Sequence, residues 1–339
     1  MTHDGKKLTG LVAATFTPLT PKGEVNLSVI GQYIDFLVEK QGVRKIFVNG
    51  TTGESLSLSV DERKQLAEAW CQKGKGKLED VIVHVGCSSL KDSQELARHA
   101  VEAGADGIAV ISPTFFKPPN AGMMPSFLYS HTYLLSSFLF ICGVDRFIYP
   151  LPLASLRLFL QEVAAAAPAL PFYYYHIPSM TGVHLLALDV VEGIEKVIPS
   201  FRGLKFSGSD LLDFGQCVSC SPGHWTHLYG MDEQLLAALA MGADGAVGST
   251  YNYMGSTMNK VLCAFDKGDL EQARKLQFQM QEIILFAIKQ GFNLAMNKQL
   301  MSEMSGISLG PPRLPLIPCD VTKAQVVVQK MYSVLGEQQ

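Results

Sequence analysis

The sequence is poor in charged residues. Asp, Glu, Lys and Arg make up 17% of its 339 residues, and the formal net charge is −3. Nucleic acids and anionic membrane surfaces attract proteins through an excess of basic residues, so we expect neither as a partner. Apolar residues make up 47% of the chain, which is ample for one large or two ordinary globular domains.

Several other features are missing. The first residues, Met-Thr-His-Asp-Gly-Lys-Lys, lack the apolar stretch of a signal peptide. The seven cysteines are odd in number and scattered, which predicts free thiols in a reducing cytoplasm. Cys217 and Cys220 form a lone CxxC with no second pair or histidine cluster nearby. A chance spacing is therefore favoured over a zinc site, and no metal is expected.

Short apolar strands alternate with helices along the chain. Strands are expected at 10–17, 44–49, 81–86, 108–112, 172–177, 203–207, 226–230 and 246–249. Helices are expected at 27–38, 59–70, 89–104, 156–167, 186–196, 209–217, 233–241 and after Tyr253. Asn26 caps the first helix, and Ser59 with Glu62 forms a capping box for the second. Such strict alternation predicts parallel strands.

The number of units predicts how the sheet closes. Eight strand–helix units in about 250 residues fit an α/β fold of the (β/α)8 TIM barrel type better than an open dinucleotide-binding sheet. No GxGxxG motif follows the first strand, which further argues against a dinucleotide-binding sheet. Gly-Ala-Asp-Gly recurs at 104–107 and 242–245, each time between a helix and a strand. We predict a barrel domain over 8–255 and additional C-terminal helices over 256–339.

Conspicuous polar residues stand at the carboxyl ends of the predicted strands. They are Thr51 and Thr52 after the second strand, Tyr175 in the fifth, Lys205 in the sixth, Asp232 and Glu233 after the seventh, and Ser249 in the eighth. Barrel enzymes carry their catalytic groups on this face. Scattered surface residues would not select one end of the barrel, so the pattern predicts an active site.

Lys205 is central to this set. It is the lone lysine of an apolar strand, Gly203-Leu204-Lys205-Phe206-Ser207, and alternation turns it to the same side as Gly203 and Ser207. A lysine facing a packed interior needs a partner or loses its proton, and a desolvated amine can form a Schiff base with a carbonyl substrate. The alternative is a strand-end lysine that extends to solvent. The shared position of the polar residues favours catalysis.

The neighbouring groups have chemical uses beside such a lysine. Gly50-Thr51-Thr52-Gly53 offers two hydroxyls and unhindered backbone N–H groups suited to a carboxylate, although alone it is only a turn. Tyr175 can relay protons, whereas Tyr173 is interpreted as packing. Asp232-Glu233 either binds polyol hydroxyls or stabilises a helix N-terminus.

Five motifs, in order, resemble one enzyme family. They are GTTGE at 50–54, YYYHIPSMTG at 173–182, GLKFS at 203–207, GMDE at 230–233 and GADGAVGSTYN at 242–252. Together they resemble the N-acetylneuraminate lyases (sialic acid aldolases) of the class I pyruvate aldolase family, which also contains the dihydrodipicolinate synthases. The resemblance runs from about residue 8 into the C-terminal region, with one interruption.

The resemblance implies a role for each matching residue. Thr51 and Thr52 would hold the pyruvate carboxylate, Lys205 would form the imine, and Tyr175 would shuttle the proton. The hydroxylated tail of the sugar would be bound by Ser207, Gly230, Asp232, Glu233, Gly248 and Ser249. The family uses no metal or organic cofactor and is commonly tetrameric. A cytoplasmic homotetramer whose partners are the small molecules sialic acid and pyruvate is therefore expected.

The residues after Tyr175 bear on the substrate. Dihydrodipicolinate synthases carry an arginine there for a second carboxylate, whereas this chain has Met180. The implied reaction is therefore reversible cleavage of N-acetylneuraminate into N-acetylmannosamine and pyruvate. Two alternatives stay open: a pyruvate-imine aldolase for another 2-keto sugar acid, and a non-catalytic relative disabled by the interruption.

That interruption is an apolar insertion at about 121–154. Its only formally charged residues are Asp145 and Arg146. The stretch 127–144 therefore contains no charge, and its length is near the ~18-residue minimum for a membrane span. Its serines, threonine and histidine make it a poor span, and a lid, an oligomer contact, or a spliced or mispredicted segment are alternatives. We expect it to be poorly ordered and prone to aggregation. Phe115 and Phe116 precede it where relatives often place a relay tyrosine, so that role is not assigned.

Overall fold

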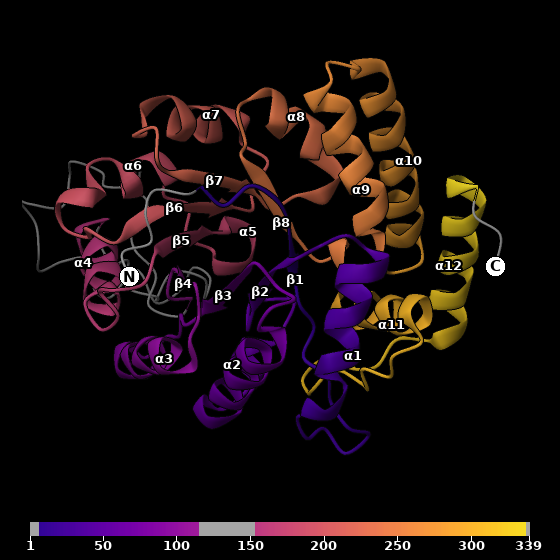
Figure 1. Cartoon of the computed structure of the whole chain (residues 1–339), viewed down its shortest axis with the longest axis horizontal. Coiled ribbons are helices and arrows are strands. Elements are labelled where there is room, and N and C mark those ends of the chain that lie inside the picture. Colours follow the sequence, from indigo (N-terminus) through magenta and orange to yellow (C-terminus); the bar gives the residue numbers. More distant parts are fainter. Residues whose placement is uncertain (1–6, 115–152, 337–339) are drawn as a thin grey trace, which may run out of the picture.

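Eight parallel strands close into a barrel (Figure 1). The computed structural model describes residues 7–114 and 153–336. The strands pair in chain order, and the last pairs with the first. They are β1 Gly10–Ala14, β2 Lys45–Val48, β3 Asp80–His84, β4 Gly107–Ile111, β5 Phe172–His176, β6 Phe201–Phe206, β7 Thr226–Tyr229 and β8 Gly245–Gly248. The predicted (β/α)8 barrel is confirmed, and each strand overlaps its predicted range.

Helices surround the barrel and extend it on one side. The α-helices of the described chain are α1 Ile30–Asp35, α2 Val60–Gly74, α3 Leu90–Ala103, α4 Leu153–Ala164, α5 Pro178–Thr181, α6 Ala187–Val191, α7 Leu211–Cys220, α8 Leu235–Ala240, α9 Tyr251–Asp266, α10 Leu270–Lys289, α11 Leu294–Ser305 and α12 Val321–Leu335. The crossover helices of the barrel lie outside the strands in Figure 1, as strand–helix alternation requires.

Local sequence signals set several helix ends. At α2 both bonds of the capping box are present: Ser59 N donates to Glu62 Oε2 at 2.8 Å, and Glu62 N donates to Ser59 Oγ at 3.2 Å. The two Gly-Ala-Asp-Gly turns begin with Gly104 (φ 78°) and Gly242 (φ 94°), in the left-handed region that glycine tolerates. The same helix-to-strand turn is therefore used twice.

Some helices differ from the prediction. The single helix expected at 186–196 is divided, because Gly193 adopts φ 64° between α6 and a 3-10 turn at Ile194–Lys196. Helix α5 was not predicted; it is one turn long, with Pro178 at its start, a position that favours proline. Helix α4 begins at Leu153, inside the range expected for the insertion. Phe115, Phe116 and residues 121–152 of the insertion lie outside the described residues.

The strands separate two apolar cores. Leu204 and Phe206 point outward from β6 into the large core between the strands and the helices. The inner core fills the barrel and contains Leu8, Val12, Ala14, Phe47, Ile82, Ala109, Ile111, Tyr173, Tyr175, Leu228 and Val247. Strand alternation produces this division, since successive side chains point to opposite faces. The inner core is the foundation on which any site at the barrel mouth is built.

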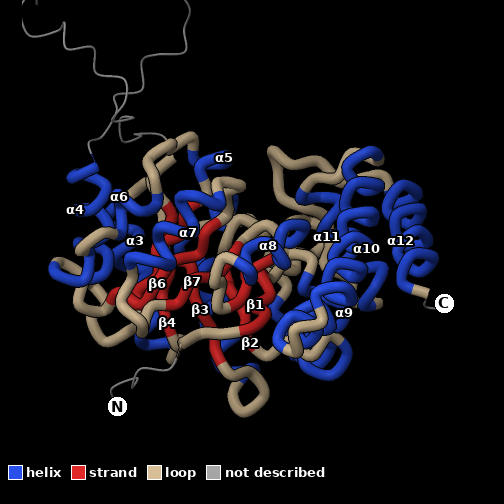
Figure 2. The backbone as a smooth tube through the Cα atoms, turned by 90° about the horizontal axis from the view of Figure 1, so that it is seen from above, coloured by secondary structure: helices blue, strands red, loops and turns tan. Residues whose placement is uncertain are grey.

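The C-terminal helices gather on one side of the barrel. Helix α9 packs against β1, contains one non-helical residue at Met254 (φ −126°), and continues to Asp266 across the predicted boundary at 255/256. Helices α10 and α11 contact α9, and α12 contacts both α10 and α11 (Figures 1 and 2). The division into a barrel domain and a helical extension stays a prediction.

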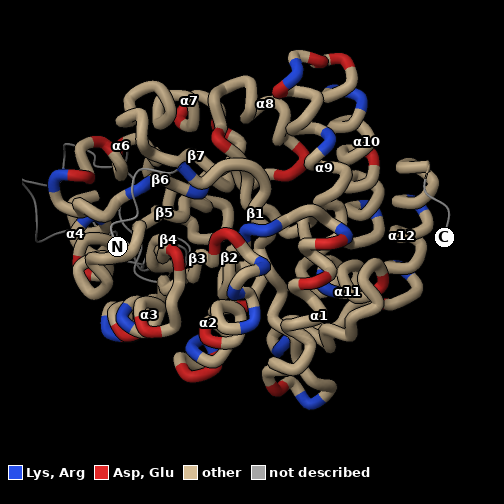
Figure 3. Tube along the Cα trace, viewed as in Figure 1, with Lys and Arg blue, Asp and Glu red and all other residues tan. Residues whose placement is uncertain are grey.

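Charged residues are concentrated away from the strands. In Figure 3 many of them lie on outer helices, for example along α2 and α3. Within residues 7–114 and 153–336, no helix is both long and apolar enough to cross a membrane.

Candidate active site

Strand β6 turns Lys205 into the barrel. Lys205 is 5% exposed, while its neighbours Leu204 and Phe206 are fully buried on the opposite face. This is the orientation that alternation predicts. The side chain borders two spaces: a void of about 10 Å³ enclosed by inner-core residues and a pocket of about 360 Å³ at the mouth. Lys205 therefore lies at the boundary between the packed interior and the open site.

Two aromatic rings flank the amine. Lys205 Nζ lies 4.3 Å from the ring centroid of Phe47 and 4.0 Å from that of Tyr175, within the range of cation–π interactions. In the part of the chain that the structure describes, Nζ has no hydrogen-bond partner. The rings contact the amine through their faces and do not form hydrogen bonds with it. The amine is thus available to a carbonyl carbon in the pocket.

Tyr175 connects the lysine to the loop after β2. Its hydroxyl lies 3.3 Å from Thr51 Oγ1, a hydrogen bond in which either group can donate. Tyr173 shares the inward face but packs in the inner core, whereas Tyr174 points outward and its hydroxyl lies 3.0 Å from Ser112 Oγ. Among the three consecutive tyrosines, Tyr175 is the one that lines the pocket.

The loop after β2 is held in an unusual backbone conformation. Asn49 (φ 60°) and Glu54 (φ 57°) both adopt left-handed conformations that residues with side chains rarely take. Thr17 Oγ1 donates to the carbonyl oxygen of Gly53 at 2.7 Å. Thr51 and Thr52, between these fixed points, are half-buried and face the pocket. Their hydroxyls are presented to a ligand by a backbone that is held at both ends.

Two predicted site glycines permit close packing at the mouth. A Cβ on Gly230 would lie 1.9 Å from Ser207 Oγ, and a Cβ on Gly248 would lie 1.8 Å from Asp232 Oδ1. Real carbon atoms never approach oxygen atoms this closely. Glycine at these positions therefore lets the Ser207 hydroxyl and the Asp232 carboxylate occupy the pocket wall.

Asp232 is a buried carboxylate at this wall. Thr250 donates twice to its Oδ2, from the backbone nitrogen at 3.0 Å and from Oγ1 at 2.6 Å. Burial raises the pKa of Asp232 to about 6, although the Thr250 hydrogen bonds oppose the rise. Its buried Oδ1 has no hydrogen-bond partner within the described residues. The Tyr251 hydroxyl is likewise buried without a partner in the described chain, and burial, with a contribution from Asp232, raises its pKa, so a donor from Tyr251 or from a ligand would satisfy this oxygen.

One pocket unites the predicted residues. It has a volume of about 360 Å³, and its lining includes Thr51, Thr52, Tyr175, Lys205, Ser207, Gly230, Asp232, Glu233, Gly248 and Ser249. These are all ten predicted site residues, from five strand ends. Met180 also lines the pocket and is 62% exposed. The site thus combines an amine, several hydroxyls and two carboxylates in a space suited to a small polar ligand.

Other lining residues were missed. Ile284, Ile288 and Phe292, from α10 and the segment after it, form an apolar part of the wall. They lie far along the chain from every motif, so no local pattern signals them. Phe47 and His84 pack against the Tyr175 ring, with centroids 5.7 and 6.0 Å away. Strand alternation, which puts both inside the barrel, would have identified them.

The CxxC pair takes no part in this site. Cys217 is buried on α7, and burial raises the pKa of its thiol well above the usual range. Cys220 ends the same helix and is exposed. Within the described ranges, no group of three or more His, Cys, Asp or Glu side chains is arranged to hold a metal ion.

Solved structures of similar fold include N-acetylneuraminate lyases. The N-acetylneuraminate lyase of Aliivibrio salmonicida matches with a TM-score of 0.82 and 36% identity, covering 97% of each chain. That of Proteus mirabilis matches with a TM-score of 0.82 and 32% identity, covering 97% of this chain and 99% of that one.

Sequence relatives are more similar still. The N-acetylneuraminate lyase of Danio rerio is 58% identical over 334 residues, which cover 98% of each protein. That of Homo sapiens is 54% identical over 317 residues, or 93% of this chain and 89% of that protein.

A family model matches most of the chain. The model of the dihydrodipicolinate synthetase family matches residues 7–129 and 141–333. It leaves 130–140 unmatched, a shorter interruption than the 121–154 expected from the sequence. Together with the barrel and the high identity to the relatives, this match shows that the chain belongs to the dihydrodipicolinate synthetase family.

Proposed function

We propose that this protein is a Schiff-base (class I) aldolase that reversibly cleaves N-acetylneuraminate into N-acetylmannosamine and pyruvate. The observation that most supports it is the Lys205 amine, which has no hydrogen-bond partner among the described residues and lies with the other nine predicted residues around one pocket. Relatives named N-acetylneuraminate lyase, at 54–58% identity, support the choice of substrate. Met180, where dihydrodipicolinate synthases carry an arginine, supports it further.

The reaction begins at Lys205. Its neutral amine attacks the C2 ketone of the open-chain sugar acid, and loss of water forms a protonated imine. Tyr175 donates the proton with which this water leaves, and its phenolate then takes the proton of the C4 hydroxyl as the C3–C4 bond breaks and the electron pair moves into the imine to give an enamine. The aldehyde product, N-acetylmannosamine, leaves. Protonation of C3 and addition of water to the imine release pyruvate and restore the amine.

The other residues bind the two halves of the substrate. Thr51 and Thr52 donate hydrogen bonds to the carboxylate that becomes part of pyruvate. The sugar-derived half is bound by the opposite wall, whose residues are Ser207, Gly230, Asp232, Glu233, Gly248 and Ser249. Asp232 Oδ1, which is buried and lacks a partner in the described chain, accepts a sugar hydroxyl.

Borohydride trapping tests the proposal directly. The protein is incubated with pyruvate, reduced, and analysed by intact and peptide mass spectrometry. A reduced pyruvate adduct on Lys205, absent in Lys205→Ala, is the expected result, followed by release of N-acetylmannosamine from N-acetylneuraminate. The absence of an adduct from correctly folded protein would reject the aldolase function and favour a relative disabled by its insertion.

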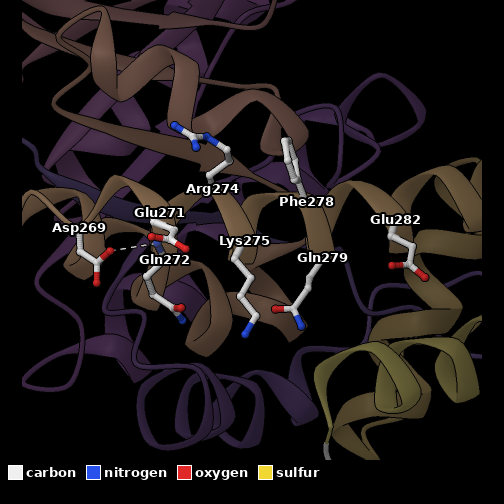
Figure 4. Close-up of a pocket in the computed structure, with 8 residues that line it drawn as sticks. All are labelled: Asp269, Glu271, Gln272, Arg274, Lys275, Phe278, Gln279 and Glu282. Carbon is white, nitrogen blue, oxygen red and sulfur yellow. Dashed lines mark hydrogen bonds between the residues drawn. The ribbon is translucent and has the colours of Figure 1, made fainter.

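We also propose that the protein is a homotetramer. The support is apolar surface on α10, where Leu270, Phe278 and Leu285 are 49%, 58% and 54% exposed. Phe278 stands among charged and amide side chains beside a hollow of about 720 Å³ (Figure 4). Light scattering is expected to give four times the mass of one chain. A monomer mass for the wild type would reject the assembly, and Phe278→Glu should weaken it if α10 is a contact.

A cytoplasmic location is proposed as well. It is supported by the six described cysteines, which are all free. A disulfide-rich scaffold would be expected of a secreted protein that needs cross-links. Cell fractionation should recover the protein with cytoplasmic markers, and recovery with secreted or membrane markers would contradict this.

A further inference from the structure

Helix α11 buries two adjacent polar residues. Asn297 and Lys298 are 5% and 1% exposed, although they lie in the middle of an otherwise apolar buried face. Successive residues of an α-helix point about 100° apart, so the two side chains reach different neighbours. Neither is among the described residues that line the pocket. Asn297 nevertheless bonds Ser249, which lines the pocket, and Lys298 bonds Glu54, which ends the loop that carries Thr51 and Thr52.

Lys298 bonds the loop after β2. Its Nζ donates to Glu54 Oε1 at 2.8 Å and to the carbonyl oxygen of Pro311 at 3.1 Å. The other carboxylate oxygen of Glu54 accepts from the backbone nitrogen of Arg313 at 2.8 Å. Glu54 is the residue whose left-handed backbone closes the loop, two positions after Thr52. Lys298 and Arg313 therefore anchor the end of the loop that presents Thr51 and Thr52.

Arg313 extends this anchor. Its guanidinium donates to both carboxylate oxygens of Glu62, at 2.6 and 2.7 Å, and to the carbonyl oxygen of Ser57 at 3.0 Å. Bidentate pairs of this kind are geometrically specific. The C-terminal region is thus hydrogen-bonded to the loop after β2 at Glu54 and at Ser57, and to the first turn of α2 at Glu62. These bonds oppose the backbone strain at Glu54.

Asn297 bonds the opposite end of the site. Its Nδ2 donates to Ser249 Oγ at 2.8 Å, and its Oδ1 accepts from the Tyr253 hydroxyl at 2.8 Å. The bond from Tyr253 sets the orientation of the amide, so that Asn297 donates to Ser249 and does not accept from it. Because Ser249 Oγ is already an acceptor here, its own hydrogen is left to donate to a ligand.

We propose that Asn297 and Lys298 are positioning residues, through which the C-terminal helices align the two ends of the substrate site. Lys298 acts through Glu54 on the carboxylate-binding threonines, and Asn297 presents the Ser249 hydroxyl to the sugar-derived half. The inference rests on the proposed aldolase function. It predicts that substitution of Lys298 weakens the binding of pyruvate, whereas substitution of its neighbour Asn297 weakens the binding of N-acetylmannosamine.

Two variants separate the two ends. In Lys298→Met, the pyruvate concentration that half-saturates borohydride trapping on Lys205 is expected to rise about tenfold or more, since a charge-assisted hydrogen bond is lost. The KM for N-acetylmannosamine in the condensation direction, measured at saturating pyruvate, should change by less than about twofold. In Asn297→Ala the pattern should reverse, with a KM for N-acetylmannosamine raised about threefold to tenfold and trapping nearly unchanged.

Two controls distinguish positioning from folding. Met301→Ala removes fully buried packing from the same helix and should leave both constants unchanged in the folded protein. If Lys298→Met fails to fold, Glu54→Gln combined with Lys298→Met removes both buried charges at once. That double variant should fold, because no charge is left unpaired, yet it should keep the raised pyruvate constant.

The outcomes separate the two proposals. If the wild type forms no pyruvate adduct, both the aldolase function and this inference are overturned. If the wild type is active but the two variants shift both constants together, or shift neither, the positioning role is wrong and the aldolase function stands. The inference is established if Lys298→Met raises only the half-saturating pyruvate concentration and Asn297→Ala raises only the KM for N-acetylmannosamine.

Discussion

The barrel mouth and the C-terminal helices each bury one lysine, and the two lysines have opposite surroundings. Lys205 is 5% exposed, lies between two aromatic rings, and has no hydrogen-bond partner in the described chain. Lys298 is 1% exposed and is bonded to Glu54 and a backbone carbonyl. Burial is common to both, so burial alone does not identify a reactive lysine. Lys205 differs from Lys298 in bordering the pocket and in having no hydrogen-bond partner among the described residues, as we expect of a nucleophilic amine.

The two environments also have opposite energetic consequences. Burying an unpaired amine destabilises a fold, which is tolerated at active sites because function requires it. A paired buried lysine is different, because removing it leaves its carboxylate partner charged and unsatisfied. We therefore expect substitution of Lys205 to abolish the reaction without loss of stability. Substitution of Lys298 is expected to lower stability without abolishing the reaction.

The largest effect is expected at Lys205. Lys205→Met should lower kcat by a factor on the order of 10⁴ or more, because the group that forms the covalent intermediate is gone. Its free energy of unfolding, measured by urea titration, should equal or exceed that of the wild type. Residual activity within about tenfold of the wild type would show that another group carries the chemistry.

Lys298→Met should produce the largest loss of stability. Leaving the Glu54 carboxylate unpaired is expected to lower the free energy of unfolding by about 3–5 kcal/mol. The same urea titration measures it, and adding Glu54→Gln should recover most of the loss. A loss below about 1 kcal/mol would mean that the pair contributes little and would weaken the contrast with Lys205.

Tyr175 allows the surroundings of Lys205 to be tested separately. Tyr175→Phe keeps the ring that faces the amine but removes the hydroxyl, so kcat should fall about 10²-fold while pyruvate is still trapped on Lys205. Tyr173→Phe is the matched control: it lies on the same strand face, below the pocket, and should retain kcat. Equal effects of the two substitutions would argue against a proton-transfer role for Tyr175.

The smallest expected effect is a pH dependence at Asp232. Its pKa of about 6 means that the carboxylate is protonated in the folded protein as the pH falls from 7 to 5. Protonation removes an ionised acceptor, so the KM for N-acetylmannosamine should rise, by about tenfold at pH 5. Asp232→Asn should show a raised KM that is constant over this range. A flat wild-type profile would exclude Asp232 from binding the sugar as a carboxylate.

The strand-borne part of the site could be predicted from the sequence. Alternation alone places Lys205 and Tyr175 inside the barrel, because successive residues of a strand face opposite sides. Parallel strands in chain order then bring their carboxyl ends together, and this is why Thr52 and Asp232 share a pocket although they are 180 positions apart in the sequence. These rules need no knowledge of packing beyond the number of strands.

The part contributed by the C-terminal helices could not be predicted. Lys298 is one polar residue in a helix, and nothing nearby in the sequence indicates that it meets Glu54, 244 positions earlier. The same is true of Ile288 in the pocket wall. The division of the helix expected at 186–196 was missed as well, because a glycine inside a helical pattern is common and its φ is set by packing.

The sequence by itself determined the barrel, the inward face of the strands that carry the predicted site residues, and the family, since these depend on local periodicity and on motifs. Tertiary structure alone decided which buried lysine lacks a hydrogen-bond partner among the described residues, because that depends on partners from distant segments. Lys205 meets two rings and a cavity, whereas Lys298 meets a carboxylate. Helical and strand periods predict the direction of a side chain but not the groups that it contacts. The reactivity of a buried lysine depends on those groups.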